Sequence, residues 1–355
     1  MENVYPVPVP APAPVRFAAA GLAHVHVDIL VQALLRAGGV LAAVVEPDDA
    51  SYARYAAGWP AARRVSLDEV LVDTSIELVV TAAVPADRAG IAALALESGK
   101  DVLADKPLCV DRDSFDAVAA AQARSGRHLT VWFGERLFNP SVLRAVDLVR
   151  DGLIGKVLHF TGFGPHLLAR ETRPQWHFDP TRNGGILVDL ACHQIDAFLA
   201  FTGAHAARIQ AARARNLHHR DLPGFEDVGD LLLEAEGGAL GYARVDWHTP
   251  GGLGLWGDGR TFLVGSEGTL ELRRTIDPAG RGVGGHLFVV DATEPRYIEV
   301  PEAEPPFAAQ LLADVRDGTE TAMSSAHTLA VTDLALQAQE LAVEAVGRWG
   351  RALVA

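Results

Sequence analysis

The chain has 355 residues, of which 49% are apolar, 45 acidic and 31 basic, which gives a net charge of −14. This length exceeds that of a usual single-domain protein, so we expect two domains. The apolar content excludes a largely disordered chain. The acidic balance argues against nucleic acid and anionic membrane surfaces as partners.

Residues 1–14 carry alternating prolines from Pro6 to Pro14. This pattern favours an extended chain and excludes the helical core of a signal peptide, so we expect a disordered tail, with a proline-motif ligand as the alternative. The only cysteines are Cys109 and Cys192. The sequence contains no run of about 18 apolar residues, so we expect no membrane-spanning helix. We therefore expect a cytoplasmic protein without a disulfide framework.

The first half alternates short apolar runs with amphipathic segments. The expected strands are 15–20, 40–45, 77–82, 101–104 and 128–133, and the expected helices are 24–37, 85–97 and 111–125. Pro85 at a helix start, and Gly99 and Gly126 just past helix ends, agree with these limits. Apolar strands alternating with helices predict a doubly wound parallel sheet, a Rossmann-type dinucleotide-binding domain, over residues 15–137.

The second half, residues 138–355, is richer in strands. After a helix at 141–150, strands are expected at 157–164, 206–216, 230–236, 241–248, 260–264, 269–272 and 286–291, and helices at 186–200, 308–317 and 326–345. Turn pairs such as Gly237-Gly238 separate the strands. This predicts an α+β substrate domain with a large, mostly antiparallel open sheet, whose last helix can pack back on the first domain.

The first strand leads into Gly21-Leu22-Ala23-His24-Val25-His26 and then a helix, which is where a pyrophosphate-binding turn lies. Amides near His24 and Val25 would face the phosphates, and Ala23 is small enough for a close approach. With one glycine, a plain strand–turn–helix corner remains an alternative. Glu46 ends the second strand, where an acid can bind a ribose 2′-hydroxyl and repel a 2′-phosphate, which favours NAD over NADP; alternatively, it is an ordinary helix-start acid.

Two further clusters carry polar side chains at expected ligand-facing positions. Asp105-Lys106-Pro107 follows a buried strand, at the edge of a parallel sheet where ligands bind. Asp189 and His193 lie four residues apart on an otherwise apolar helix, with Asp196 one turn further, which suggests a polar stripe along a cavity. A solvated lysine and a surface Asp–His pair are the alternatives.

These clusters resemble the signatures of the glucose-fructose oxidoreductase/inositol dehydrogenase (Gfo/Idh/MocA) family, from about Val15 to Ala345. Asp105-Lys106-Pro107 is similar to the family's E-K-P, and Gly184-Gly185 with Asp189 and His193 to its G-G-x-x-x-D-x-x-x-H. The segments 65–71, 79–85, 152–157 and 265–270 also resemble family motifs in order and spacing. This chain departs from the family in its glycine-poor turn and in Asp105, which replaces a glutamate.

The resemblance implies a nicotinamide-dependent oxidoreductase acting on a secondary alcohol of a sugar or cyclic polyol, with Lys106, Asp189 and His193 as the catalytic trio. It also implies cofactor contacts from Ala82, Ala83, Pro85, Asp105 and Pro107. We expect His193 to act as base, Lys106 to stabilise the oxygen, and Asp189 to orient His193 or a substrate hydroxyl. Further residues on segments leading toward the crevice are expected to contact the substrate: Arg136, His166, Trp176 and His177.

Two rival functions were weighed. A metal-dependent hydrolase would use His24-x-His26, but it needs the eight strand–helix units of a barrel, so no metal is expected. A non-catalytic dinucleotide- or sugar-binding regulator would not need Lys106, Asp189 and His193 together. Alternation over 241–247 places Tyr242 and Arg244 on a polar-aromatic sheet face suited to a subunit interface, so we expect a homodimer or homotetramer.

Overall fold

The computed structural model describes residues 13–277, 279–301 and 303–352. Its first sheet has six parallel strands in the order β3-β2-β1-β4-β5-β6. The strands are β1 (Arg16–Ala20), β2 (Val40–Val45), β3 (Arg63–Arg64), β4 (Leu78–Thr81), β5 (Asp101–Asp105) and β6 (Leu129–Trp132). The predicted doubly wound sheet is confirmed, and the predicted tail falls almost wholly outside the described residues.

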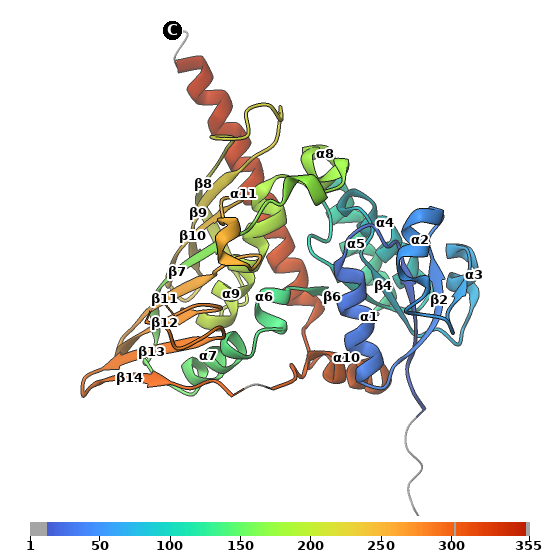
Figure 1. The fold of residues 1–355 in the computed structure, drawn as a ribbon, viewed down its shortest axis with the longest axis horizontal. Coiled ribbons are helices and arrows are strands. Elements are labelled where there is room, and N and C mark those ends of the chain that lie inside the picture. The colour runs from blue at the N-terminus through green and yellow to red at the C-terminus, as the bar shows by residue number, and fades with distance from the viewer. Residues whose placement is uncertain (1–12, 278, 302, 353–355) are drawn as a thin grey trace, which may run out of the picture.

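Helices connect these strands and flank the sheet (Figure 1). They are α1 (His26–Arg36), α2 (Asp49–Ala56), α3 (Leu67–Val72), α4 (Pro85–Glu97) and α5 (Arg112–Ser125). The predicted boundaries of α4 are confirmed, and Gly126 ends α5 in the left-handed conformation at φ 61°. The sequence pattern missed α2, β3 and α3, although Ser66 and Glu69 form a capping box at the start of α3.

The second sheet has eight strands in the order β14-β13-β12-β11-β7-β10-β9-β8. The strands are β7 (Val157–Pro165), β8 (Ala207–Arg215), β9 (Val228–Ala235), β10 (Leu240–Asp246), β11 (Arg260–Gly265), β12 (Gly268–Arg273), β13 (His286–Asp291) and β14 (Pro295–Ile298). All neighbours pair antiparallel except β7 and β10. The predicted mostly antiparallel sheet is confirmed, and β14 was not predicted.

Helices cover one face of the second sheet and leave the other open (Figure 1). On the covered face, glycines admit helix α9 (Cys192–Thr202): a Cβ on Gly162 would meet Gln194, and one on Gly241 would meet Phe198. The predicted alternation on β10 is confirmed, because Ala243 and Val245 are buried while Arg244 is exposed. The open face therefore presents polar side chains such as Arg244, together with exposed apolar ones such as Leu232 and Val264.

The predicted helix at 186–200 is not one regular α-helix. Leu187–Ala191 forms a π-helical turn, and α9 follows from Cys192. A π-turn contains more than four residues per turn. Asp189 and His193 are therefore rotated further apart around the helix axis than a spacing of four in an α-helix predicts. Such turns occur often at functional sites, and this one contains Asp189 and ends two residues before His193.

The last helices join the two sheets. Helix α10 (Phe307–Asp317) packs on α1, and α11 (Ser325–Ala352) contacts both β6 and β8. At the start of α11, the hydroxyls of Ser325 and Thr328 accept the backbone amides of Leu129 and Val131 on the edge strand β6. Two helices, α6 (Gly134–Leu137) and α7 (Pro140–Arg150), link the sheets, and we propose the domain boundary near residue 137, in this connection.

One described segment, Pro180–Thr202, is long and apolar enough to cross a membrane. It contains the short helix α8 (Pro180–Asn183) and α9. Within its most apolar stretch, 89% is buried inside the protein. The segment is therefore the core element that α7, α11 and the second sheet surround.

Candidate active site

The turn after β1 has the shape of a phosphate cradle. Gly21 has φ 77°, and a Cβ there would lie 2.5 Å from the Cβ of Ala83, so a side chain is excluded. The amide of His24 donates to Ala82 O, so it is not available to a ligand, contrary to the expectation. Within residues 21–26, the amides of Ala23 and Val25 donate to no acceptor among the described residues. Together they fit one phosphate at the start of α1.

Glu46, at the end of β2, holds this turn in place. Its carboxylate accepts the amides of Leu22 at 2.9 Å and Asp48 at 3.0 Å, and the residue is 8% exposed. Arg64 on β3 lies beside it and donates to Glu46 O and to the Asp49 carboxylate. The sequence pattern gave no arginine here, because it covered only the residues that directly follow Glu46.

Asp105 ends β5 in a network of four donors. Its carboxylate receives Nη2 of Arg88 at 2.8 Å and the amide of Lys106 at 2.8 Å, and it lies 3.2 Å and 2.9 Å from Nδ1 of His24 and of His26. Three potential metal ligands therefore lie within 4.8 Å of one another, in His24, His26 and Asp105. The Arg88 guanidinium, 2.8 Å away, already places a positive charge on this carboxylate, which disfavours a metal cation at the same oxygen atoms.

Arg88 is fully buried and ties the end of β5 to the start of α4. Its guanidinium donates to Ala83 O at 2.7 Å, to Pro107 O at 3.0 Å and, in a shorter contact, to Lys106 O. With the ion pair to Asp105, these bonds fix the backbone on both sides of Lys106. The Lys106 side chain therefore leaves a rigid turn, as a site residue requires.

Lys106 and Asp189 form an ion pair between the two domains. Nζ of Lys106 donates to Asp189 Oδ1 at 2.6 Å and to Asp189 O at 2.9 Å, which leaves one of its three N–H groups for a ligand. Burial disfavours the Lys106 cation and is the largest single effect, but Asp189, Cys192 and Asp105 together outweigh it and raise the lysine pKa. Lys106 is therefore a cation at neutral pH.

Asp189 was expected to orient His193, but the structure pairs it with Lys106 instead. His193 is 4% exposed, and its Nδ1 is buried without a partner among the described residues. Burial, together with the nearby Lys106 cation, lowers the pKa of His193 to about 3, although the Glu135 carboxylate acts in the opposite direction. The imidazole is therefore neutral at physiological pH and can accept a proton.

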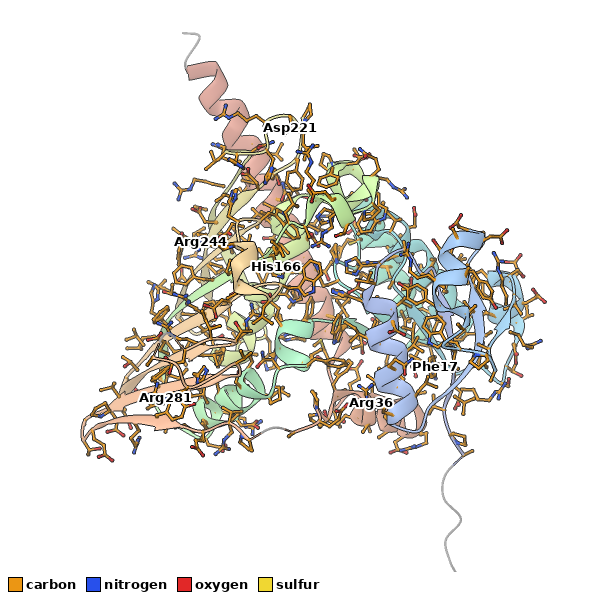
Figure 2. All side chains as sticks on the ribbon, viewed as in Figure 1. Phe17, Arg36, His166, Asp221, Arg244 and Arg281 are labelled. Atoms are coloured by element: carbon orange, nitrogen blue, oxygen red, sulfur yellow. The ribbon has the colours of Figure 1, made fainter. Side chains whose placement is uncertain are left out.

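These groups line one cavity of about 330 Å³ between the domains. In Figure 2, His166 lies on the inner side of the second sheet, toward the parallel sheet, and Arg244 lies on its outer side. The predicted site residues on the cavity wall are His24, Val25, Pro85, Lys106, His166, Trp176, His177, Asp189 and His193. Residues from both halves of the chain thus meet at the carboxyl edge of the parallel sheet, where ligands of such sheets bind.

Arg136 is the predicted substrate residue that does not reach this cavity. Its guanidinium donates to both carboxylate oxygens of Asp196, at 2.8 Å and 2.6 Å, and His327 lies 2.8 Å from the same carboxylate. Both partners of the ion pair are largely buried. Arg136 and Asp196 therefore have a structural role, and the predicted polar stripe ends at His193.

Several cavity residues were missed. Glu135 accepts Nη1 of Arg274 at 2.7 Å and Nε2 of Gln194 at 3.0 Å, and lies 3.3 Å from Nε2 of His166. Burial acts to raise the pKa of Glu135, but Arg274, His193 and His166 together outweigh it and lower the pKa to about 2. The other missed residues include Trp132, Arg173, Trp247 and Trp256. No local signal marks this group, because its members lie far apart in the sequence.

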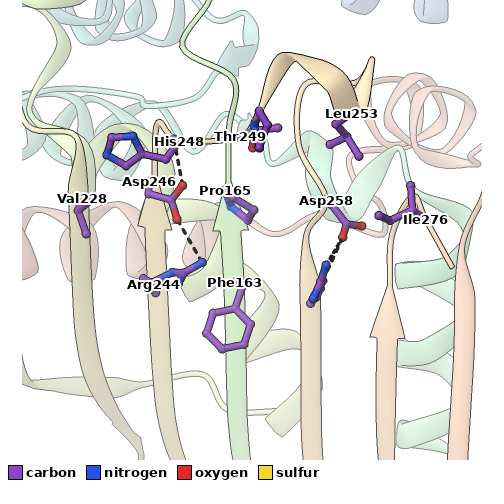
Figure 3. A pocket seen from close by; sticks show the side chains of 12 residues that line it. Phe163, Pro165, Val228, Arg244, Asp246, His248, Thr249, Leu253, Asp258 and Ile276 are labelled. Atoms are coloured by element: carbon purple, nitrogen blue, oxygen red, sulfur yellow. Dashed lines mark hydrogen bonds and ion pairs between the residues drawn. The ribbon is translucent and has the colours of Figure 1, made fainter. Parts of the chain in front are cut away.

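A larger hollow, of about 780 Å³, lies on the open face of the second sheet (Figure 3). Its charged groups are paired with each other: Arg244 lies 3.2 Å from Asp246, and Arg260 lies 2.8 Å from Asp258. It holds none of the candidate catalytic residues. The smaller cavity is therefore the candidate active site despite its size.

The parallel sheet, the glycine cradle and the lysine at the cavity between the domains define a two-domain, dinucleotide-binding oxidoreductase. The family model described as "Oxidoreductase family, NAD-binding Rossmann fold" matches residues 17–133, and the model for the GFO/IDH/MocA C-terminal domain matches residues 142–271. The chain belongs to the Gfo/Idh/MocA family, as its motifs predicted.

Relatives and solved structures agree with this assignment. The chain is 26% identical to scyllo-inositol 2-dehydrogenase (NAD(+)) of Bacillus subtilis, over 57% of this chain and 56% of that protein. It is 28% identical to inositol 2-dehydrogenase 2 of Saccharopolyspora erythraea, over 77% and 76%. A crystal structure from Erwinia carotovora atroseptica SCRI1043, described only in general terms as an oxidoreductase, has 40% identity and a TM-score of 0.89, and covers 92% of this chain and 98% of that one. The chain thus spans about half the length of the Bacillus enzyme that it matches.

Proposed function

We propose that the protein is a nicotinamide-dependent dehydrogenase that oxidises a secondary alcohol of a sugar, a sugar derivative or a cyclic polyol, or reduces the corresponding ketone. One observation carries this proposal: the Lys106–Asp189 pair and the neutral His193 face the same cavity, next to the Gly21 cradle. Relatives named as inositol dehydrogenases support the substrate class.

Lys106, His193 and Asp189 each have a separate role in the proposed oxidation. The free N–H of Lys106 donates to the substrate oxygen and stabilises the negative charge that develops there. His193 accepts the hydroxyl proton, since its neutral form prevails. Asp189 keeps the Lys106 ammonium charged and in place. A nicotinamide bound in this cavity would supply the acceptor for the hydride of the carbinol carbon.

A panel of aldoses, inositols and sugar acids, monitored by the absorbance of the reduced nicotinamide, tests this function. Activity with at least one compound of the panel, absent from a Lys106→Met variant measured beside the native protein, is the expected result. If the native protein binds dinucleotide and sugar in calorimetry but turns over no compound in either direction, the protein is a binding regulator instead.

For the cofactor, we propose NAD rather than NADP, because the buried Glu46 carboxylate at the end of β2 would repel a 2′-phosphate. The expected contacts are the amides of Ala23 and Val25 for the phosphates, and Ala82, Ala83 and Pro85 beside them.

Glu46→Gln tests the cofactor preference. We expect the ratio of the NADP and NAD dissociation constants to fall by at least about tenfold, because a like charge next to the phosphate is removed. Calorimetry with each dinucleotide measures the ratio. Glu77→Gln is the control, because the Glu77 carboxylate lies on the same domain and accepts the backbone amide of Arg16 in an exposed hydrogen bond. An unchanged ratio, or tighter NADP binding by the native protein, contradicts the assignment.

We propose that the open face of the second sheet associates with a second copy of the chain, to form a cytoplasmic homodimer or homotetramer. The face is polar and aromatic, with Phe163, Tyr242 and Phe262 in ring contact, and hollowed as Figure 3 shows. Light scattering should give a mass of at least twice 37.7 kDa at micromolar concentration. A stable mass near that of one chain contradicts the association.

A further inference from the structure

Arg173 is a cavity residue that neither the motifs nor the proposed chemistry uses. It follows the short 3-10 turn η1 (Arg170–Thr172) after β7 and reaches the cavity wall. Its guanidinium carbon lies 5.2 Å from the ring centroid of Trp247 and 5.1 Å from that of Trp256. Contact with two indole rings positions the planar group without neutralising it.

Few of the donors of Arg173 have acceptors within the protein. Nε donates to Leu168 O at 2.9 Å, and Nη2 makes a long contact of 3.5 Å with Leu167 O. In the described part of the chain, Nη1 has no acceptor. These two carbonyls hold one side of the guanidinium, and the opposite edge keeps donors for a ligand.

The other cations at the cavity each have a carboxylate partner. Lys106 pairs with Asp189, Arg88 with Asp105 and Arg274 with Glu135. Arg173 has no carboxylate within 4.0 Å among the residues that the structure describes. Asp189 attracts it electrostatically but is committed to Lys106. Imidazoles aside, four cations thus face three carboxylates, and one positive charge is left over.

The position of this unpaired charge, partly buried in the cavity wall, is energetically unfavourable. Burial lowers the pKa of Arg173, which shows that its surroundings disfavour the cation. A partly desolvated charge without a partner is unfavourable, and a bound anion removes this penalty. The planar fork of arginine fits a carboxylate through two parallel hydrogen bonds.

The other polar clusters lack such an opening. The Asp105 carboxylate already accepts Arg88 and the amide of Lys106, and the arginines of the outer hollow are paired with aspartates. Arg173 therefore stands apart from them as a cation that faces the cavity without an anion.

We propose that the substrate is a polyhydroxy acid of one ring or its open-chain equivalent, and that its carboxylate binds the free edge of Arg173. The single excess charge matches a carboxylate better than a phosphate ester, which carries about −1.5 to −2. A cavity of about 330 Å³ is at the small end of ligand pockets and favours one sugar-sized ring over a nucleotide sugar. This inference rests on the proposed function and narrows its substrate class.

The first test compares acids with their neutral parents in the native protein and needs no variant. Hexuronates and quinate are assayed for kcat/KM beside the matching hexoses and inositols, with hexose 6-phosphates as a third set. We expect the best acid to exceed its best neutral counterpart at least tenfold. A neutral sugar or a sugar phosphate as the best substrate overturns the proposal.

The second test measures binding, so it does not depend on turnover. Calorimetry with the best-bound acid should show at least about a thirtyfold weaker dissociation constant for Arg173→Gln, the loss expected when one partner of a hydrogen-bonded charge pair is removed. Arg173→Lys, which keeps the charge but not the fork, should lie between. Affinity for the neutral sugar should not change.

Arg170→Gln is the matched control, because Arg170 lies on the same turn but pairs with Asp221 near the surface. Equal affinity of the native protein and Arg173→Gln for every acid overturns the proposal. If the acid binds through Arg173 but neither protein oxidises any compound, the carboxylate site stands and the proposed dehydrogenase activity fails. If neutral sugars are oxidised but no acid binds the native protein more tightly than Arg173→Gln, the dehydrogenase activity stands and the carboxylate site fails.

Discussion

Lys106→Met lowers kcat by at least about a hundredfold while dinucleotide affinity stays within about threefold. The substitution removes the N–H that would stabilise charge on the substrate oxygen, and groups that act on developing charge contribute about 10²–10³ in rate. The fold of the turn should persist, because Arg88 holds the backbone of residues 105–107 through contacts that do not involve the Lys106 side chain. Steady-state kinetics with the best compound of the panel, and calorimetry with NAD, measure the two effects.

Two controls separate charge stabilisation from general damage at Lys106. Lys156→Met removes an exposed lysine whose Nζ contacts only Gly237 O, and it should leave kcat unchanged. The thermal midpoint of Lys106→Met should be compared with that of Lys106→Met/Asp189→Asn, which also removes the carboxylate left unpaired by the first change. Near-native kcat in the single variant would exclude Lys106 from the chemistry, whatever its stability.

Local patterns in the sequence were sufficient for the elements that carry the site. Pro85 and Gly126 fixed the start of α4 and the end of α5, because their backbone preferences act within one or two residues. The positions of Asp105 and Lys106 at the carboxyl edge of the sheet were predicted correctly, because both residues directly follow a buried parallel strand. Ligands of such sheets bind at this edge. The motif around Asp189 and His193 was recognisable because it lies within one short segment.

The partners of the charged side chains were not predictable in this way. Arg136 pairs with Asp196, 60 residues later, and Glu135 pairs with Arg274, 139 residues later. Neither spacing follows a helical or strand period, so only the tertiary fold brings them together. The same is true of Arg64, which reaches Glu46 from the neighbouring strand.

The exchange of partners at Asp189 has a further cause. A spacing of four predicted contact with His193, but the π-turn changes the angular separation of the two side chains, and the lysine from the first domain takes the carboxylate. His193 is thereby left without a carboxylate hydrogen bond, in surroundings that disfavour its cation. The pH dependence of catalysis should report this arrangement.

His193→Ala is expected to lower kcat by at least about a hundredfold, since general-base catalysis contributes about 10²–10⁴. In the native protein, the acid limb of the kcat/KM profile should lie below pH 5. The base works when neutral, and burial, which lowers its pKa from 6.5 to about 3, keeps it neutral as the pH falls through 6.5. Profiles between pH 5 and 9, with His205→Ala at an exposed histidine as control, measure this. A break near pH 6.5 that disappears in His193→Ala would show that the imidazole titrates normally, and near-native turnover in that variant would exclude His193 as the base.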